Sequence, residues 1–338
     1  MMGSSYITGL LMIVVAGLFA GSFSVPFNRN REWVWENNWL VWSFIALVAA
    51  PWIVAWITIP DITAIFASES RSLLAVAFFG LIWGAGAVLF GKGIDLLGVG
   101  LSMPIMLGLT NVIGTLMPVI LRSPAELLTA SGIRLMAGVF LIVLGIVFYA
   151  VAGERKARDI QASGNNNKMA TDRSFLKGLM VCLAAGILSP MINVAVVYGT
   201  PMQEQAVMAG ADPIYATNVV WCIALTAGCI VNVGYCLYLL YTRGTKKLYR
   251  KGSWKNWMFA VVAGVLWYMS MMIYGMGGHF LGDAGTSVGW ALMQSLAVLT
   301  GNLSGLFMGE WKDAGPMSRR IMWLGLGCML LGIVVVAI

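Results

Sequence analysis

Long apolar runs recur along the whole 338-residue chain and limit what it can fold into. A helix of roughly 20 apolar residues is long enough to cross a lipid bilayer, and a helix satisfies its own backbone hydrogen bonds there. The runs do not alternate with period two, as the strands of a membrane β-barrel do. The sequence therefore predicts an all-α integral membrane protein with ten spans, near residues 6–25, 39–59, 73–92, 99–120, 134–152, 178–198, 215–241, 257–277, 287–308 and 321–338.

Catalytic and metal-binding groups are scarce. The five cysteines fall within the predicted spans, and an odd number inside lipid argues against a disulfide framework. Cys222, Cys229 and Cys236 share one helix face, but seven residues advance a helix by about 10 Å, too far for one metal ion. The chain has one histidine and none of the common phosphate-binding, zinc-protease or nucleophile-elbow motifs. We therefore predict that it is not an enzyme and holds no cofactor or metal.

The formal net charge of +7 reflects membrane topology. Nearly all Lys and Arg residues lie in alternate loops between the predicted spans. Because cytoplasmic loops carry the basic excess, these loops are expected in the cytoplasm and both termini on the other side. The charge pattern therefore predicts a multi-pass protein of the lipid bilayer and gives no support to a nucleic-acid partner.

A polar linker divides the predicted spans into two equal sets. Residues 153–177 are rich in Asn, Gly, Ser and charged side chains, which is typical of a flexible connection. The expected units are a first five-helix repeat at 1–152, this cytoplasmic linker, and a second five-helix repeat at 178–338. Because five is odd, the second set must enter the membrane in the opposite orientation to the first.

A sequence pattern recurs 184 residues apart, once in each half. The stretches WGAGAVLFGKGIDLLG (83–98) and WYMSMMIYGMGGHFLG (267–282) share Trp, an aromatic residue seven positions later, and the same Gly and Leu-Gly positions. An inverted duplication predicts this arrangement and is characteristic of secondary transporters, which bind substrate near the membrane midplane. The alternative is that glycines recur because they allow close helix packing.

Polar and aromatic residues lie unexpectedly near the centres of several predicted spans. Unpaired amides are costly in hydrocarbon, and Trp and Tyr normally favour the membrane interfaces. Aromatic faces and amides together suit a small neutral sugar, because amides both donate to and accept from hydroxyl groups. The alternative is that these amides bond one helix to another. The candidate substrate-binding residues are Trp83, Asn111, Asn193, Trp267, Tyr268 and Gln294.

Several motifs, in order along nearly the full chain, resemble those of one transporter family. They are VPFNRNREWVWENNW (25–39), FFGLIWGAG (78–86), GTLMP (114–118), TPMQEQAVMAGADPIY (200–215), NVGYC (232–236), LWYM (266–269) and GEWKDAG (309–315). The chain thereby resembles the L-rhamnose–proton symporter family of the drug/metabolite transporter superfamily.

The resemblance implies two inverted five-helix repeats around a central cavity lined by helices 1–4 and 6–9. It also implies proton symport of L-rhamnose or a related 6-deoxyhexose by alternating access, across a bacterial inner membrane with both termini periplasmic. A metabolite or drug exporter of the same fold remains the alternative, because fold alone does not determine the cargo.

Proton coupling needs a group that titrates within reach of the substrate. No Asp, Glu, Lys or Arg lies near the centre of a predicted span. The candidates for coupling or gating are Glu36, Asp95 and His279, which lie near span ends. The alternatives are that Glu36 anchors a loop, that Asp95 pairs with Lys92, and that His279 is a solvated loop residue.

Overall fold

A computed structural model describes residues 2–30, 32–162, 172–282, 285–307, 309 and 311–337. Those residues form helices and turns and no strand, as the apolar runs predict. Eight segments are long and apolar enough to cross a membrane: Ser5–Phe27, Trp35–Thr58, Ser70–Leu97, Leu101–Leu121, Ala130–Lys156, Phe175–Tyr198, Pro213–Thr242 and Trp254–Leu281. In the spans expected at 287–308 and 321–338, residues 287–307 and 321–337 are also helical, although neither span is among these eight.

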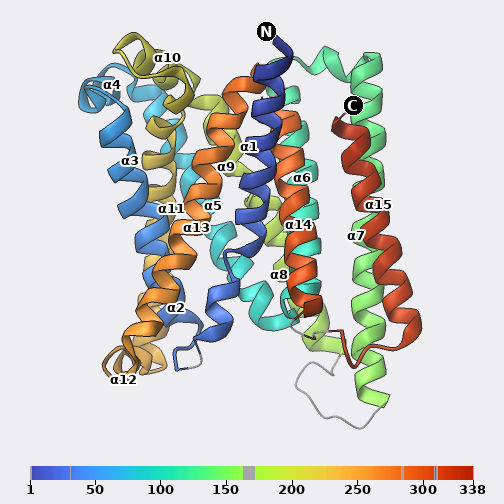
Figure 1. Cartoon of the computed structure of the whole chain (residues 1–338). Helices are drawn as coiled ribbons and strands as arrows, with labels where there is room; N and C mark the ends of the chain where they lie inside the picture. The colour runs from blue at the N-terminus through green and yellow to red at the C-terminus, as the bar shows by residue number, and fades with distance from the viewer. Residues whose placement is uncertain are drawn as a thin grey trace.

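The long helices pack as a bundle, shown in Figure 1. In chain order they are α1 (Met2–Ser22), α2 (Trp35–Phe44), α3 (Ala50–Thr58), α5 (Ser70–Leu97), α6 (Val99–Arg122), α7 (Ala130–Ala162), α8 (Asp172–Leu188), α9 (Met191–Tyr198), α11 (Asn218–Thr242), α13 (Trp254–Leu281), α14 (Trp290–Phe307) and α15 (Pro316–Ala337). Short helices α4 (Ile62–Ser68), α10 (Thr200–Met208), η4 (Pro213–Tyr215) and α12 (Leu248–Lys251) lie at the ends of the bundle. The start of α1 and the end of α15 lie at the same end (Figure 1).

Two of the spans are interrupted. A π-helical segment, η2 (Ile45–Ala49), joins α2 to α3. The span at 178–198 is broken at Ser189 and Pro190, because proline has no backbone N–H to continue the helix. Both interrupted spans contribute residues to the site described below. In transporters, interrupted helices commonly form the substrate site.

The boundaries of two elements differ from the sequence prediction. The second span begins at Trp35 rather than near residue 39, so Trp35 and Trp39 of the motif W-x-W-E-x-x-W (33–39) are helical, whereas Trp33 lies just before the helix. At the predicted linker, α7 continues to Ala162 and α8 begins at Asp172, so helix occupies both of its ends. Helices can continue beyond the lipid in charged segments. Hydropathy alone does not detect these polar helical extensions. The rest of the linker, 163–171, lies outside the described residues.

The helices that carry the repeated pattern have the same length. Both α5 and α13 are 28 residues long, and they run in opposite directions in Figure 1. Each ends at the Leu-Gly of the pattern, where Gly98 and Gly282 have positive φ angles of 80° and 60°. Positive φ is accessible to glycine without strain, so the same residues end both helices in the same way.

Glycine sets the distance between α5 and α11. A Cβ atom on Gly84 would lie 2.5 Å from the carbonyl oxygen of Gly228, so only glycine permits this approach. A Cβ on Gly228 would in turn lie 2.6 Å from the ring of Trp83. The close packing of these backbones therefore leaves the Trp83 ring lying over α11 and fixes its position.

Helices α7 and α15 pack along each other (Figure 1), and a carboxylate fixes the polar end of this contact. Asp159 Oδ2 accepts hydrogen bonds from the backbone N–H of Gly315 at 2.9 Å and from the Ser318 hydroxyl at 2.6 Å. The Ser318 and Gly315 hydrogen bonds hold the pKa of the Asp159 carboxyl below its usual value. A carboxylate of α7 thus satisfies free donors at the first turn of α15, in the way that a helix cap does.

We expect Asp159→Asn to lower the midpoint of thermal unfolding by roughly 2 °C at pH 7, because the charged acceptor is lost. A lowered folded-state pKa stabilises the protein above the unfolded value near pH 4, and this contribution disappears as pH falls through the folded pKa. The difference between the two proteins should therefore vanish on acidification. Glu154→Gln, which removes an exposed partner of Arg158, is the control and should not shift the midpoint. Equal midpoints for Asp159→Asn and the parent at pH 7 would contradict the capping role.

Candidate functional site

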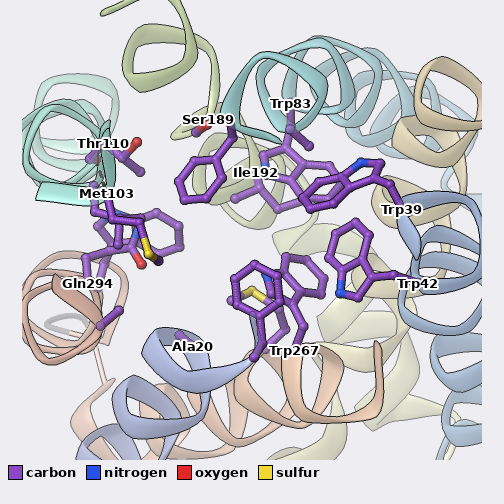
Figure 2. A pocket seen from close by; sticks show the side chains of 17 residues that line it. Ala20, Trp39, Trp42, Trp83, Met103, Thr110, Ser189, Ile192, Trp267 and Gln294 are labelled. Atoms are coloured by element: carbon purple, nitrogen blue, oxygen red, sulfur yellow. Dashed lines mark hydrogen bonds between the residues drawn. The ribbon is translucent and has the colours of Figure 1, made fainter. Parts of the chain in front are cut away.

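A buried cavity of about 80 Å³ lies between α1, α2, α5, α6, α9, α13 and α14. Figure 2 shows its lining side chains. Among the described residues, none of those that line the cavity is Asp, Glu, Lys, Arg or His. The lining residues are Ala20, Phe23, Trp39, Trp42, Trp83, Ala87, Phe90, Met103, Leu107, Thr110, Ser189, Ile192, Trp267, Met271, Trp290, Gln294 and Ala297.

Four tryptophans form a continuous aromatic wall on one side of the cavity (Figure 2). Trp83 and Trp267, the first residues of the two repeated stretches, stack with ring centroids 5.5 Å apart and an interplanar angle of 29°. Trp42 packs edge-on against Trp267 at 5.3 Å and lies 4.4 Å from Trp39. Aromatic faces of this kind pack against the C–H groups of a ligand while excluding water.

Trp39 and Trp42 are site residues that sequence reasoning missed. Both lie in the first residues of the span expected at 39–59, where interfacial tryptophans are ordinary. Because α2 begins at Trp35, residues 35, 39 and 42 lie at i, i+4 and i+7 on one helix face. The spacing of these tryptophans could have indicated that they share a helix face. That interpretation holds only if the helix begins four residues earlier than hydropathy suggests.

The opposite side of the cavity is more polar. Figure 2 shows Thr110, Met103 and Gln294 facing the tryptophans. Gln294 is 6% exposed, and its amide both donates and accepts hydrogen bonds. On the aromatic side, the Trp42 indole N–H is buried without a hydrogen-bond partner among the described residues. A hydroxyl-bearing ligand would satisfy such a donor, whereas an empty cavity leaves it unpaired.

The structure brings together only part of the set suggested by the sequence. Trp83, Trp267 and Gln294 line the cavity. Asn111 does not line it. It donates to Ser295 Oγ at 2.8 Å and to the Ala291 carbonyl at 3.2 Å, and so bonds α6 to α14. For this amide the structure favours the alternative of helix-to-helix bonding.

Asn193 and Tyr268 also lie outside the cavity lining. Asn193 donates to the carbonyls of Gly114 at 2.9 Å and Thr286 at 2.8 Å, and accepts from the Tyr274 hydroxyl at 2.8 Å. Tyr268 follows Trp267 in α13 and therefore faces a different direction, with its side chain 1% exposed. Adjacent residues of a helix cannot share one face, which explains why only the tryptophan reaches the cavity.

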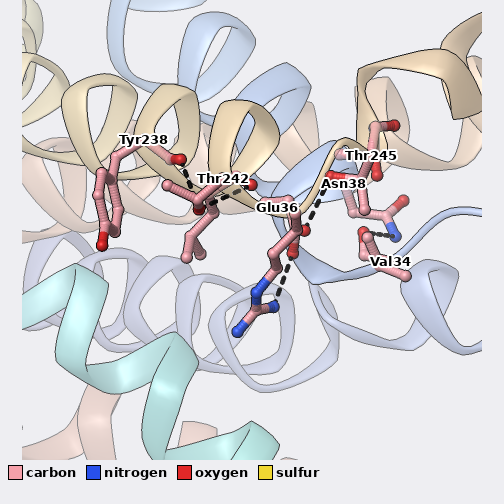
Figure 3. A network of polar contacts seen from close by, with 9 residues as sticks. Val34, Glu36, Asn38, Tyr238, Thr242 and Thr245 are labelled. Atoms are coloured by element: carbon pink, nitrogen blue, oxygen red, sulfur yellow. Dashed lines mark hydrogen bonds and ion pairs between the residues drawn. The ribbon is translucent and has the colours of Figure 1, made fainter.

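Glu36 is fully buried at the start of α2 and belongs to the polar network in Figure 3. Its carboxylate accepts from the Thr245 hydroxyl at 2.9 Å and forms an ion pair with Arg243 at 3.3 Å. The Arg243 side chain is 54% exposed. The ion pair therefore links a buried carboxylate of α2 to a solvated cation just beyond the end of α11.

Within the described ranges, no hydrogen bond or ion pair joins Asp95 or His279 to Glu36 or to each other. Asp95 is exposed near the end of α5. Lys92 forms no ion pair with Asp95 among the described residues, and its ammonium lies 5.0 Å from the centroid of the Tyr235 ring. His279 is exposed near the end of α13. The structure thus does not gather the three groups into one site.

His279 lines a second and larger cavity, of about 640 Å³, which we call the vestibule. It is formed by residues of α9, α10, η4, the turn before α11, α13 and η7 (Gly285–Gly289), towards the end of the bundle where α1 begins (Figure 1). Its polar lining includes Gln203, Glu204 and Thr217. The vestibule and the buried cavity are distinct, and they share no lining residue within the part of the chain that the structure describes.

Comparisons with known proteins agree with this architecture. Residues 2–338 match the L-rhamnose-proton symport protein family (RhaT). The L-rhamnose-proton symporters of Cronobacter sakazakii and Mannheimia succiniciproducens are each 29% identical over 98% of this chain and 96% of their own. That of Enterobacter sp. strain 638 is 30% identical over 96% of this chain and 94% of its own. No solved structure matches the chain. The chain therefore belongs to the L-rhamnose-proton symport protein family, and it is a membrane transport protein rather than an enzyme.

Proposed function

We propose that the protein takes up L-rhamnose or a related 6-deoxyhexose by proton symport across the inner membrane of a bacterium. The observation that carries the proposal is the buried, uncharged cavity with an aromatic wall facing a glutamine. A pyranose offers C–H groups to stack on tryptophan and hydroxyls to pair with an amide. The names of the relatives supply the cargo class.

The cavity lining suits a deoxy sugar in particular. The tryptophans would contact one face of the ring, and Gln294 would bond to its hydroxyls. Met103, Leu107 and Ile192 offer apolar surface for the methyl group that distinguishes a 6-deoxyhexose from a hexose. At about 80 Å³ the cavity is smaller than the roughly 300–1,000 Å³ of typical small-molecule sites. Binding therefore requires the walls to separate, as they would during alternating access.

We propose that the two halves, 1–152 and 178–338, are inverted five-helix repeats, with α14 and α15 as the ninth and tenth spans. Pairing α1, α2, α5, α6 and α7 with α8, α11, α13, α14 and α15 relates the main helix contacts to one another. Contact α1–α13 then corresponds to α8–α5, α1–α14 to α8–α6, and α11–α5 to α2–α13. The contacts α2–α11, α6–α14 and α7–α15 each map onto themselves. A twofold axis in the membrane plane would produce this pattern.

We propose Glu36 as the proton-coupling group. A buried carboxylate is costly unless it is paired, so protonation would release Arg243 and loosen α2 from the end of α11. Cys236 and Tyr249 are the other titratable groups close to Glu36. Burial raises the pKa of Tyr249 to about 12, which keeps the phenol neutral at physiological pH. Glu36 lies one helical turn from Trp39, so a change at the carboxylate would reach the aromatic wall through α2.

We expect Trp267→Ala and Gln294→Ala each to raise the Kd for L-rhamnose about fivefold, since each removes one stacking contact or hydrogen bond. Binding to purified protein is measured by calorimetry. Trp323→Ala is the control, because Trp323 is 50% exposed on α15, away from the cavity. Unchanged affinity in both cavity variants would contradict the proposed site. A lipophilic panel that raises the unfolding temperature when sugars do not would favour the exporter alternative.

Glu36→Gln is expected to abolish accumulation of labelled L-rhamnose driven by a pH gradient in liposomes, because an amide cannot carry the proton. Sugar counterflow without a gradient should continue, since it needs no net proton movement. The control Glu154→Gln should accumulate sugar as the parent does. Gradient-driven accumulation by Glu36→Gln at the parental level would exclude Glu36 as the coupling group.

Inverted repeats place the matched residues Asp95 and His279 on opposite sides of the membrane. A membrane-impermeant thiol reagent should label His279→Cys in intact cells and Asp95→Cys only after permeabilisation. Both positions are exposed, whereas Cys182, Cys222, Cys229 and Cys236 are buried and Cys328 is half-buried, so the parent protein gives the background labelling. Labelling of both variants in intact cells would disprove the inversion.

A further inference from the structure

A thin wall of three side chains separates the vestibule from the buried cavity. Tyr274 lines the vestibule, and Trp290 lines the cavity. Their rings meet edge-on at 5.6 Å with an interplanar angle of 69°. Asn193, next to the cavity residue Ile192, accepts a hydrogen bond from the Tyr274 hydroxyl at 2.8 Å. The Tyr274 side chain therefore lies between the vestibule and the cavity residue Trp290.

The position of Tyr274 in the repeated pattern also indicates its role. It lies seven residues after Trp267, about 10 Å further along α13 and on the same helix face. The matched residue in α5 is Phe90, seven residues after Trp83, and Phe90 lines the buried cavity. Because α5 and α13 run in opposite directions (Figure 1), the two aromatic residues flank the stacked tryptophans towards opposite ends of the bundle.

We propose that Tyr274 is the gate between the vestibule and the sugar cavity, and that its hydrogen bond to Asn193 is the latch that holds it closed. Asn193 is itself fixed by the backbone carbonyls of Gly114 and Thr286, so it offers a rigid acceptor on α9. Rotation of the tyrosine away from Asn193 joins the vestibule to the cavity. Phe90, which has no hydroxyl, has no equivalent latch.

This inference rests on the proposed transport function, but its test needs no sugar. A cysteine is introduced as Ser189→Cys, at a residue that lines the buried cavity, and its reaction rate with a small methanethiosulfonate is followed by intact-protein mass spectrometry. The purified parent without Ser189→Cys gives the background from native cysteines. We expect Tyr274→Phe to raise the labelling rate about fivefold, the effect of losing one buried hydrogen bond on the open population. Tyr274→Ala should raise it at least as much.

Tyr268→Phe is the matched control. It also removes a buried tyrosine hydroxyl from α13, but this hydroxyl has no hydrogen-bond partner among the described residues, and labelling should stay at the parental rate. Parental rates in both Tyr274 variants, each still monodisperse on size exclusion, would overturn the gate. Faster labelling in the Tyr274 variants without protection by L-rhamnose would support the gate and contradict the proposed cargo. Equal acceleration by Tyr268→Phe would also overturn the latch, because it would show general loosening of α13.

Discussion

The lipid environment provides no hydrogen bonds to compensate a polar group, and the rest of this structure follows from that constraint. It forces the chain into helices and requires each buried amide to find a partner. Asn111, Asn193 and Asn232 do so by bonding to other helices. The Asn232 side chain, for example, joins the carbonyl of Gly84 to the indole N–H of Trp39. The amides that looked like ligand-binding groups therefore mostly hold the walls of the cavity in place.

Gln294 and Trp42 bring polar groups to opposite sides of the cavity lining. The first belongs to α14 and the second to α2, so a ligand between them would contact both halves of the chain. The aromatic wall likewise combines Trp39, Trp42 and Trp83 of the first half with Trp267 of the second. A ligand that stabilises one arrangement of these groups would shift the balance between conformations, which is the thermodynamic requirement for coupling binding to movement.

Two sets of polar contacts lie on opposite sides of the aromatic wall along the helix axes. Glu36, Arg243 and Thr245 join α2 to the segment after α11, and Tyr274 with Asn193 joins α13 to α9. The first set contains a group that changes charge, whereas the second is neutral. In the proposed mechanism a proton would therefore act on one end of the pathway and the sugar on the gate at the other, with the tryptophans packed between them.

The length of the apolar runs and the charge of the loops between them determined the helical membrane class, and the motifs determined the family. The class and the family follow from sequence alone because these features depend only on the order of residues along the chain. The repeated stretch drew attention to Trp83 and Trp267, and both line the cavity. Sequence alone did not distinguish Gln294, which lines the cavity, from Asn111, which bonds to Ser295. It also did not reveal Trp42. Those assignments depend on which face of each helix meets a neighbour, and packing between segments far apart in the chain decides that.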